Sequence, residues 1–209
     1  KHAVKRLNIA GRNLTEYIQT HLAEDGYSFQ STAEGEIAKS IKEQLCYVAM
    51  DYNEELKAFE KTESDPDKDK RKEFELPDGT KIKVGSLMIR TPECLFNPSM
   101  LGLDVPGIHK AIHECVQKSD IDLRRDLYQN ITLSGGTTMF EFLQKSLNKE
   151  ITNLVPEGVK VKIIAPVERK FSIWIGGSVL STLATFQSSW ITSEEYNETG
   201  SSIVHRKCF

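Results

Sequence analysis

The chain has 209 residues, 39% of them hydrophobic and 27% charged, which is the composition of a globular protein with one core or two smaller lobes. Its formal net charge of −3 is too small to indicate a nucleic-acid or membrane partner through bulk electrostatics. No apolar run is long enough to predict a membrane span, and the first residues do not resemble a signal peptide. The chain also lacks an initiator Met, which suggests a fragment or a chain given only in part.

The first part of the chain is predicted to be mainly helical. A helix is expected over residues 14–22, and a second follows the capping box of Ser31 and Glu34, whose side chains can bond the backbone at a helix start. The second helix carries an apolar stripe around Cys46, which predicts a buried thiol, and the wide spacing of the four cysteines favours a reducing compartment. The stripe consists of Ile37, Ile41, Leu45, Val48 and Ala49.

Less regular features come next. The highly charged residues 60–72 have nothing to bury and predict a solvated loop, whereas residues 74–76 and 81–84 flank a turn sequence and predict a β-hairpin. Residues 91–107 are rich in Pro and Gly and contain apolar side chains without a helix or sheet face of their own. Such a cluster favours an interaction surface. Its apolar members are Met100, Leu101 and Leu103.

The remaining chain is predicted to alternate between helices and strands, which indicates an α/β architecture. The expected elements are helices over residues 107–117 and 121–128, a strand over 131–133, a helix with Phe140, Leu143, Leu147 and Ile151 on one face, strands over 159–165 and 171–175, and a helix from Val179 after a glycine turn.

The strongest chemical signal is the Gly-Gly turn, residues 134–138, between a predicted strand and a predicted helix. Its two glycines allow a ligand to approach the backbone, and a helix start presents free N–H groups, so the pattern indicates a phosphate site. A plain helix entry is the alternative, because Thr138 and Glu141 also match a capping box.

Lys39, Lys42 and Glu43 share one face of the helix that follows Ser31. They suit contact with a ribose or a base edge, and a solvated charged face is the alternative. His109 and His113 have a spacing that can ligate zinc, but no third ligand matches them, so no metal site is predicted. No set of side chains for nucleophilic catalysis is evident, and no catalytic residue is assigned.

Long strings of the sequence, all in the same order, resemble the C-terminal half of actin. They are LNIAGRNLT at residues 7–15, IKEQLCYVA at 41–49, LSGGTTM at 133–139, KIIAP at 162–166, WIGGS at 174–178 and SIVHRKCF at 202–209. The resemblance covers the whole chain except the charged loop. It implies an actin-like (ribonuclease H-like) ATPase fold of the α/β class, with one large lobe in which helices flank a sheet and one smaller helical lobe. The implied units are residues 1–9 with 104–171 (sheet), 10–103 (helices and hairpin) and 172–209 (part of a third unit).

The resemblance also implies site residues. Contacts to ATP or ADP, bound with Mg²⁺ or Ca²⁺, would come from Gly11, Lys39, Lys42, Glu43, Gly135, Gly136, Thr137, Met139, Phe140 and Lys170. Met100, Leu101 and Leu103 would belong to an apolar plug between filament strands. A cleft for binding partners and the next subunit would be formed by Ile175, Val179, Leu180, Leu183, Thr185 and Ser189. The residues that hold the cation and the attacking water would lie in the N-terminal half, so this chain alone would be inactive.

Several positions depart from the usual actin pattern and indicate a divergent member. Lys39 replaces an Arg and cannot reproduce its planar fork, and Ser189 replaces a Met in the implied cleft. The remaining departures are Asn8 for Asp, Phe140 and Phe171 for Tyr, Glu141 and Phe142 for a Pro-Gly pair, and Val167 for Pro.

The implied function is that of a cytoplasmic, cytoskeletal filament subunit whose ATP hydrolysis is linked to assembly, with partners such as myosin, profilin and cofilin. The alternative is an actin-like subunit fixed in a chromatin-remodelling or axonemal motor complex, with assembly suppressed. A sugar kinase of the same superfamily is disfavoured, because such kinases do not share these strings.

Overall fold

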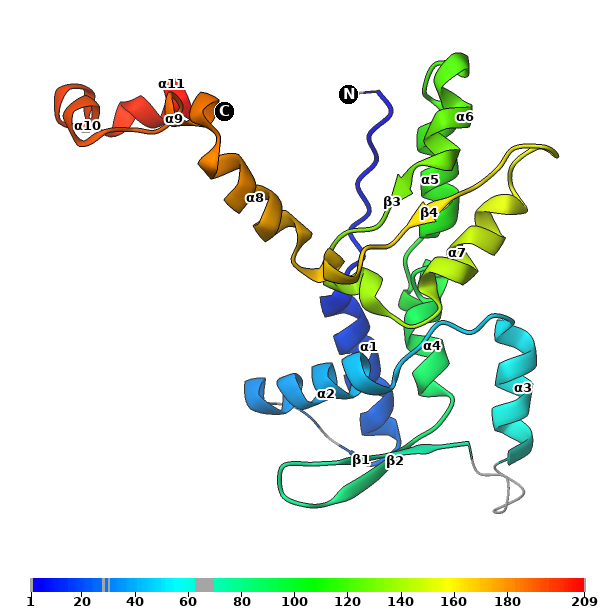
Figure 1. Cartoon of the computed structure of the whole chain (residues 1–209). Coiled ribbons are helices and arrows are strands. Elements are labelled where there is room, and N and C mark those ends of the chain that lie inside the picture. The colour runs from blue at the N-terminus through cyan, green and yellow to red at the C-terminus, as the bar shows by residue number, and fades with distance from the viewer. Residues whose placement is uncertain (1, 28, 30, 63–69, 209) are drawn as a thin grey trace.

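The computed structural model describes residues 2–27, 29, 31–62 and 70–208. Most of the charged loop predicted over residues 60–72 therefore lies outside the described residues. The helices and strands form a main body, and a C-terminal arm projects from it (Figure 1).

The first part of the body is helical, as predicted. Its elements are α1 (Gly11–Glu24), α2 (Thr32–Leu45), α3 (Tyr52–Thr62), the hairpin strands β1 (Lys72–Glu75) and β2 (Lys81–Val84), and α4 (Leu87–Glu93). The predicted hairpin is confirmed, with the two strands antiparallel. The predicted capping box is confirmed as well: the Glu34 amide donates to Ser31 Oγ at 3.2 Å, and the Ser31 amide donates to Glu34 Oε2 at 2.7 Å. Local sequence chemistry therefore fixes both features.

The second helix is shorter than predicted. It ends at Leu45, so Val48 and Ala49 do not extend its stripe. The chain turns away because its backbone bonds to other elements: the Tyr47 amide donates to the Met88 carbonyl at 3.2 Å, and the Val48 amide donates to the Glu141 carbonyl at 3.0 Å. These bonds join the helical part to the second half of the body.

Cys46 comes directly after the end of α2. Its thiol is buried, as predicted, and burial raises the pKa of this thiol to about 12. An apolar environment of this kind makes the thiol unreactive.

The Pro- and Gly-rich segment forms a short 3₁₀ helix, η2 (Pro98–Leu101), which Gly102 ends with a left-handed φ of +70°. Met100 and Leu101 are half-buried and pack against the main hydrophobic core. The expectation that these side chains have no face to pack on is therefore wrong for two of the three residues. Leu103 is also half-buried but is not among the residues packed against this core.

The second part of the body combines helices with a small sheet. Its elements are α5 (Ile108–Gln117), α6 (Ile121–Gln129), β3 (Ile131–Thr132), η3 (Gly136–Met139), α7 (Leu143–Thr152), β4 (Ile163–Ile164) and η4 (Val167–Lys170). The helices predicted over residues 107–117 and 121–128 are confirmed. Strands β3 and β4 are parallel neighbours, and within the described residues they form a sheet of two strands only.

The strand predicted over residues 159–165 is reduced to Ile163 and Ile164. Side chains of α7, rather than a neighbouring strand, bond part of this backbone. Gln144 Nε2 donates to the Ile163 carbonyl at 2.7 Å, and Asn148 Nδ2 donates to the Val161 carbonyl at 3.2 Å. A strand needs a neighbouring strand along its length, and β3 pairs with only two residues of this segment.

The helix after the Gly-Gly turn starts later than predicted. Leu143, Leu147 and Ile151 form the buried face of α7, but Phe140 precedes the helix and Thr138 does not cap it. Phe142, the residue before α7, has a left-handed φ of +63°, a conformation that is unfavourable for a side chain of this size. Its ring stands edge-on to that of Tyr47, with 6.3 Å between the centroids.

All the regular elements of the described C-terminal arm are helices, and residues 188–192 between two of them are irregular. The arm consists of α8 (Ser172–Thr182), α9 (Ala184–Gln187), α10 (Ser193–Thr199), η5 (Gly200–Ile203) and α11 (Val204–Lys207). The predicted strand over residues 171–175 is wrong, because α8 begins at Ser172 and continues through Gly176 and Gly177. A short apolar run does not distinguish a strand from a helix by periodicity.

Helix α8 has no charged residue and buries none of its side chains. Ile173 and Trp174 are each 80% exposed. The helix makes its main contacts with η4 and α9. Figure 1 shows that it extends away from the main body, which contains helices α1 through α7. The main hydrophobic core, by contrast, runs continuously from α1 to β4 and includes no described residue of the arm.

Candidate functional site

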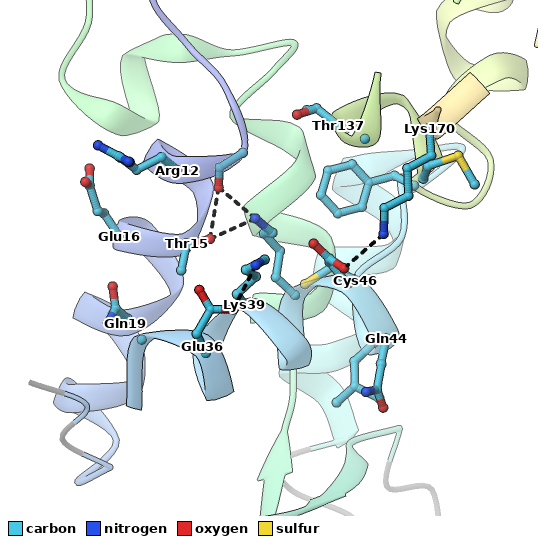
Figure 2. A pocket seen from close by; sticks show the side chains of 18 of the residues that line it. Arg12, Thr15, Glu16, Gln19, Glu36, Lys39, Gln44, Cys46, Thr137 and Lys170 are labelled. Carbon is cyan, nitrogen blue, oxygen red and sulfur yellow. Dashed lines mark hydrogen bonds and ion pairs between the residues drawn. The ribbon is translucent and has the colours of Figure 1, made fainter. Parts of the chain in front are cut away.

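A cavity with a volume of about 1070 Å³ lies between α1, α2 and the segment from η3 to Glu141 (Figure 2). Most of its lining is polar or charged. The lining residues are Gly11, Arg12, Thr15, Glu16, Gln19, Ser31, Thr32, Gly35, Glu36, Lys39, Lys42, Glu43, Gln44, Leu45, Cys46, Lys72, Gly136, Thr137, Met139, Phe140, Glu141 and Lys170.

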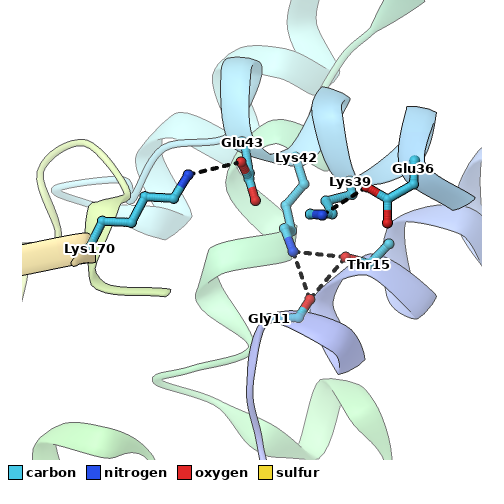
Figure 3. Close-up of polar contacts among 7 residues, drawn as sticks. All are labelled: Gly11, Thr15, Glu36, Lys39, Lys42, Glu43 and Lys170. Carbon is cyan, nitrogen blue, oxygen red and sulfur yellow. Dashed lines mark hydrogen bonds and ion pairs between the residues drawn. The ribbon is translucent and has the colours of Figure 1, made fainter. Parts of the chain in front are cut away.

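Lys42 joins α2 to the start of α1 inside this cavity. Its ammonium group donates to the Gly11 carbonyl at 2.7 Å and to Thr15 Oγ1 at 2.8 Å, and Thr15 Oγ1 itself donates to the Gly11 carbonyl at 2.9 Å (Figure 3). The Lys42 side chain is buried, and burial lowers the pKa of its ammonium group. Two of the three ammonium protons therefore serve a contact within the protein.

Two other lysines along the cavity are paired with carboxylates. Lys39 Nζ donates to Glu36 Oε2 at 2.8 Å, and this hydrogen bond raises the pKa of Lys39. Lys170 Nζ lies 3.8 Å from Glu43 Oε2, so η4 and α2 meet through an ion pair (Figure 3). Both lysine side chains remain about half exposed, which leaves them accessible to a ligand.

The Gly-Gly turn forms the wall opposite α2. Gly135 has a φ of +97°, which favours glycine at this position. Gly136 faces open space, since a Cβ built there would have no atom within 4 Å. A Cβ on Gly11 would lie 3.3 Å from Thr137 Oγ1, so α1 and the turn approach each other closely at that point. The backbone of the turn is thus exposed to the cavity at Gly136.

The structure gathers most of the predicted nucleotide contacts around this cavity. Nine of the ten residues line it: Gly11, Lys39, Lys42, Glu43, Gly136, Thr137, Met139, Phe140 and Lys170. Gly135, the tenth residue, does not line the cavity but precedes Gly136 and shapes the turn. The cavity is also lined by a polar face of α1 that was not among the predicted contacts, made by Arg12, Thr15, Glu16 and Gln19. Its helical spacing of three and four residues was the available signal.

The other predicted residues lie on different elements. The plug residues belong to η2 and the chain after it. The predicted partner cleft lies on α8, α9 and their flanking residues, where Val179, Leu180 and Leu183 are 57%, 47% and 46% exposed. These sites and the cavity therefore occupy separate parts of the chain.

The two histidines considered for zinc each contact an aromatic residue instead. His109 is buried and stacks on Phe96 with 5.7 Å between ring centroids, and His113 Nδ1 lies 2.8 Å from the Tyr128 hydroxyl. In the described part of the chain, no group of three His, Cys, Asp or Glu side chains has an arrangement that would hold a metal ion.

Among the residues that the structure describes, no helix combines the length and apolar character needed to cross a membrane. The family model for actin matches residues 1–209, which is the entire chain. The match agrees with the strings of sequence quoted above and with the mixture of helices and small sheets. The chain belongs to the actin family.

Proposed function

We propose that this chain is the C-terminal half of a divergent actin that binds ATP or ADP and assembles into filaments. The observation that carries the proposal is the gathering of nine implied nucleotide contacts, from four separate segments of the sequence, around one cavity of about 1070 Å³. Proteins often build ligand sites in clefts of this size, with a few polar groups that orient the ligand.

The chemistry of the cavity suits a nucleotide. The half-exposed ammonium groups of Lys39 and Lys170 provide positive charge for phosphates or hydrogen bonds for a sugar and base. The open backbone at Gly136 allows close approach of an anion, and Met139 with Phe140 offers an apolar surface for a base. The described residues thus supply one wall of a nucleotide site.

Mg²⁺ or Ca²⁺ would neutralise phosphate charge in such a site. The described residues supply no cluster of ligands for this ion, so we assign the ion and the positioning of the attacking water to the N-terminal half. ATP hydrolysis then belongs to the complete protein, and this chain contributes nucleotide binding.

The proposed assembly uses two further surfaces. The plug segment around Leu103 would contact other filament strands, and the exposed apolar residues of α8 would receive the next subunit or partners such as myosin, profilin and cofilin. A cytoplasmic, cytoskeletal location follows from this role.

The test is ATP affinity in the complete protein that contains this chain. Gly136→Val should weaken binding by at least about tenfold, because a side chain would block approach to the backbone. The fold has room for this valine, so the loss should occur without a change in thermal stability. Gly177→Val is the matched control, because Gly177 also faces open space and does not line the cavity. Equal ATP affinity in the wild type and Gly136→Val would contradict the proposed site.

Assembly is tested by sedimentation of the complete protein in magnesium and ATP. A filament subunit should pellet above a critical concentration. A protein that binds ATP but stays in the supernatant would instead support a fixed subunit of a larger complex.

A further inference from the structure

The Gly-Gly turn is bonded to a side chain that lies outside the cavity. Arg169 belongs to η4, and all three of its guanidinium nitrogens donate to backbone carbonyls. Nε and Nη2 both reach the Thr138 carbonyl at 3.2 Å, and Nη1 reaches the Pro166 carbonyl at 3.0 Å. The Arg169 carbonyl in turn accepts a bond from the Gly135 amide at 2.8 Å. One residue therefore bonds the backbone on both sides of Gly136 and Thr137.

Other bonds of this turn are mostly internal. Thr138 donates to the Gly135 carbonyl through its amide at 3.0 Å and through its hydroxyl at 2.7 Å. Ser134 Oγ adds a contact to Ser172 Oγ at 2.6 Å, and Ser172 Oγ donates to the Arg169 carbonyl at 3.1 Å. The contact between the two serines therefore also leads to Arg169, so Arg169 is central to the connection between the turn and η4.

We propose that Arg169 is a positioning residue for the nucleotide site, an inference that rests on the proposed function. It does not line the cavity, so it acts through the turn. Its bonds set where the exposed backbone of Gly136 faces the ligand. They also fix η4, from which Lys170 reaches Glu43 across the cavity. A planar guanidinium is needed, because a lysine ammonium cannot span the Thr138 and Pro166 carbonyls with the same fork of donors.

The experiment compares three variants of the complete protein with the wild type. Arg169→Met removes every side-chain donor, and Arg169→Lys keeps the charge without the fork. Arg124→Met is the matched control, because Arg124 also makes three bonds near a helix end: Nε to the Ser119 carbonyl at 3.1 Å, Nη1 to Gln117 Oε1 at 2.9 Å and Nη2 to the Gln117 carbonyl at 2.6 Å. Arg124 does not line the cavity either.

Two quantities are measured: the Kd for ATP with magnesium, and the increase in Tm that saturating ATP causes. Arg169→Met and Arg169→Lys should both bind ATP roughly 10- to 100-fold more weakly, which is the loss expected when hydrogen bonds to a charged ligand are weakened. The ATP-induced increase in Tm should shrink in both variants. Arg124→Met should lower Tm with and without ATP by the same amount and keep the wild-type Kd.

Each contrary result has a distinct meaning. Full ATP affinity in Arg169→Lys would show that only the charge matters and would overturn the positioning role. Unchanged affinity in Arg169→Met, with a lower Tm, would reduce Arg169 to a structural residue. A wild-type protein that does not bind ATP would overturn the proposed function and this inference together.

Discussion

Lys42 shows how one residue serves both the fold and the site. The family resemblance implies that it contacts a nucleotide, yet its ammonium group already bonds the Gly11 carbonyl and the Thr15 hydroxyl. A buried ammonium group is stable only when its protons find acceptors, and here the acceptors belong to α1. Lys42 therefore stabilises the position of the first turn of α1 at the edge of the cavity.

Replacing Lys42 tests this stabilising role. Lys42→Met keeps the length of the side chain but removes two hydrogen bonds, and we expect the free energy of unfolding to fall by about 1–3 kcal/mol. Lys39→Met is the control, because Lys39 makes an exposed pair with Glu36 whose loss should cost less than about 0.5 kcal/mol. Denaturant unfolding without nucleotide measures both. Equal stability of the two variants would show that the Lys42 contacts are energetically unimportant.

Glu93 introduces a pH dependence. Burial raises the pKa of its carboxyl from an ordinary value of 4.5 to about 7, and the charge of Glu150 adds to the effect. The folded state then binds the Glu93 proton more tightly than the unfolded state does. Stability consequently falls as the pH rises from about 4.5 to about 7, and above that range the penalty is complete.

Glu93→Gln should remove this penalty. At pH 8 we expect the variant to be more stable than the wild type, by roughly 3 kcal/mol, and at pH 4 the two should be alike. Glu114→Gln provides a control of the opposite sign, because a hydrogen bond from Lys5 lowers the pKa of Glu114. Denaturant unfolding curves at pH 4 and pH 8 measure these differences. A Glu93→Gln effect on stability that does not change with pH would contradict the raised pKa of Glu93.

At the scale of elements, the plug segment divides into residues that pack on the main core and one half-buried residue, Leu103, that does not. Met100 and Leu101 pack on the main core, which explains their apolar character without any partner. Leu103 comes after the αL residue Gly102 and is not packed on that core. The proposed assembly role is therefore concentrated on Leu103.

Single aspartate substitutions separate the two parts. Leu103→Asp should block sedimentation of filaments in the complete protein, because it places a charge in a contact that excludes water. It should lower Tm less than Leu101→Asp does, because Leu103 is not packed on the main core. Leu101→Asp should lower the free energy of unfolding by roughly 2–4 kcal/mol, because it takes a charge into the edge of the core. Normal filament formation by a folded Leu103→Asp variant would rule out the plug role for this residue.

At the scale of the whole molecule, the described chain has one wall of the proposed nucleotide site and an uncovered arm. The cavity is lined by α1, α2, the Gly-Gly turn and their neighbours, and α8 is apolar on all sides and exposed. A helix of this character is normally buried by another part of a protein. Both features agree with the proposal that a second half covers the nucleotide and the arm.

The 209-residue chain alone should therefore bind ATP weakly, release no phosphate and have low solubility. Phosphates held from one side remain in water, where each charge contact is screened and weak, and the exposed apolar residues of α8 favour aggregation. Titration of the purified chain with ATP and magnesium, followed by a phosphate-release assay, measures the first two properties. Tight binding with turnover would place the complete catalytic apparatus within these residues.

The sequence by itself determined the features that depend on neighbouring residues. The capping box of Ser31 and Glu34 and the hairpin around the Pro-Asp-Gly-Thr turn were predicted correctly, and so was the buried face of α7 apart from Phe140, because each follows from contacts within about four residues or from a simple period. The family resemblance added nine of the residues that line the cavity but not the polar face of α1.

Only the tertiary structure decided features that depend on distant partners. Residues 171–175 have the apolar character of a strand but form the start of α8, and residues 159–165 pair over two positions only. Lys42 bonds a carbonyl 31 residues away, and Arg169 bonds one at the same separation in sequence. A backbone carbonyl is present in every residue and leaves no pattern in the sequence, so the chain had to fold before these two side chains could be assigned their partners.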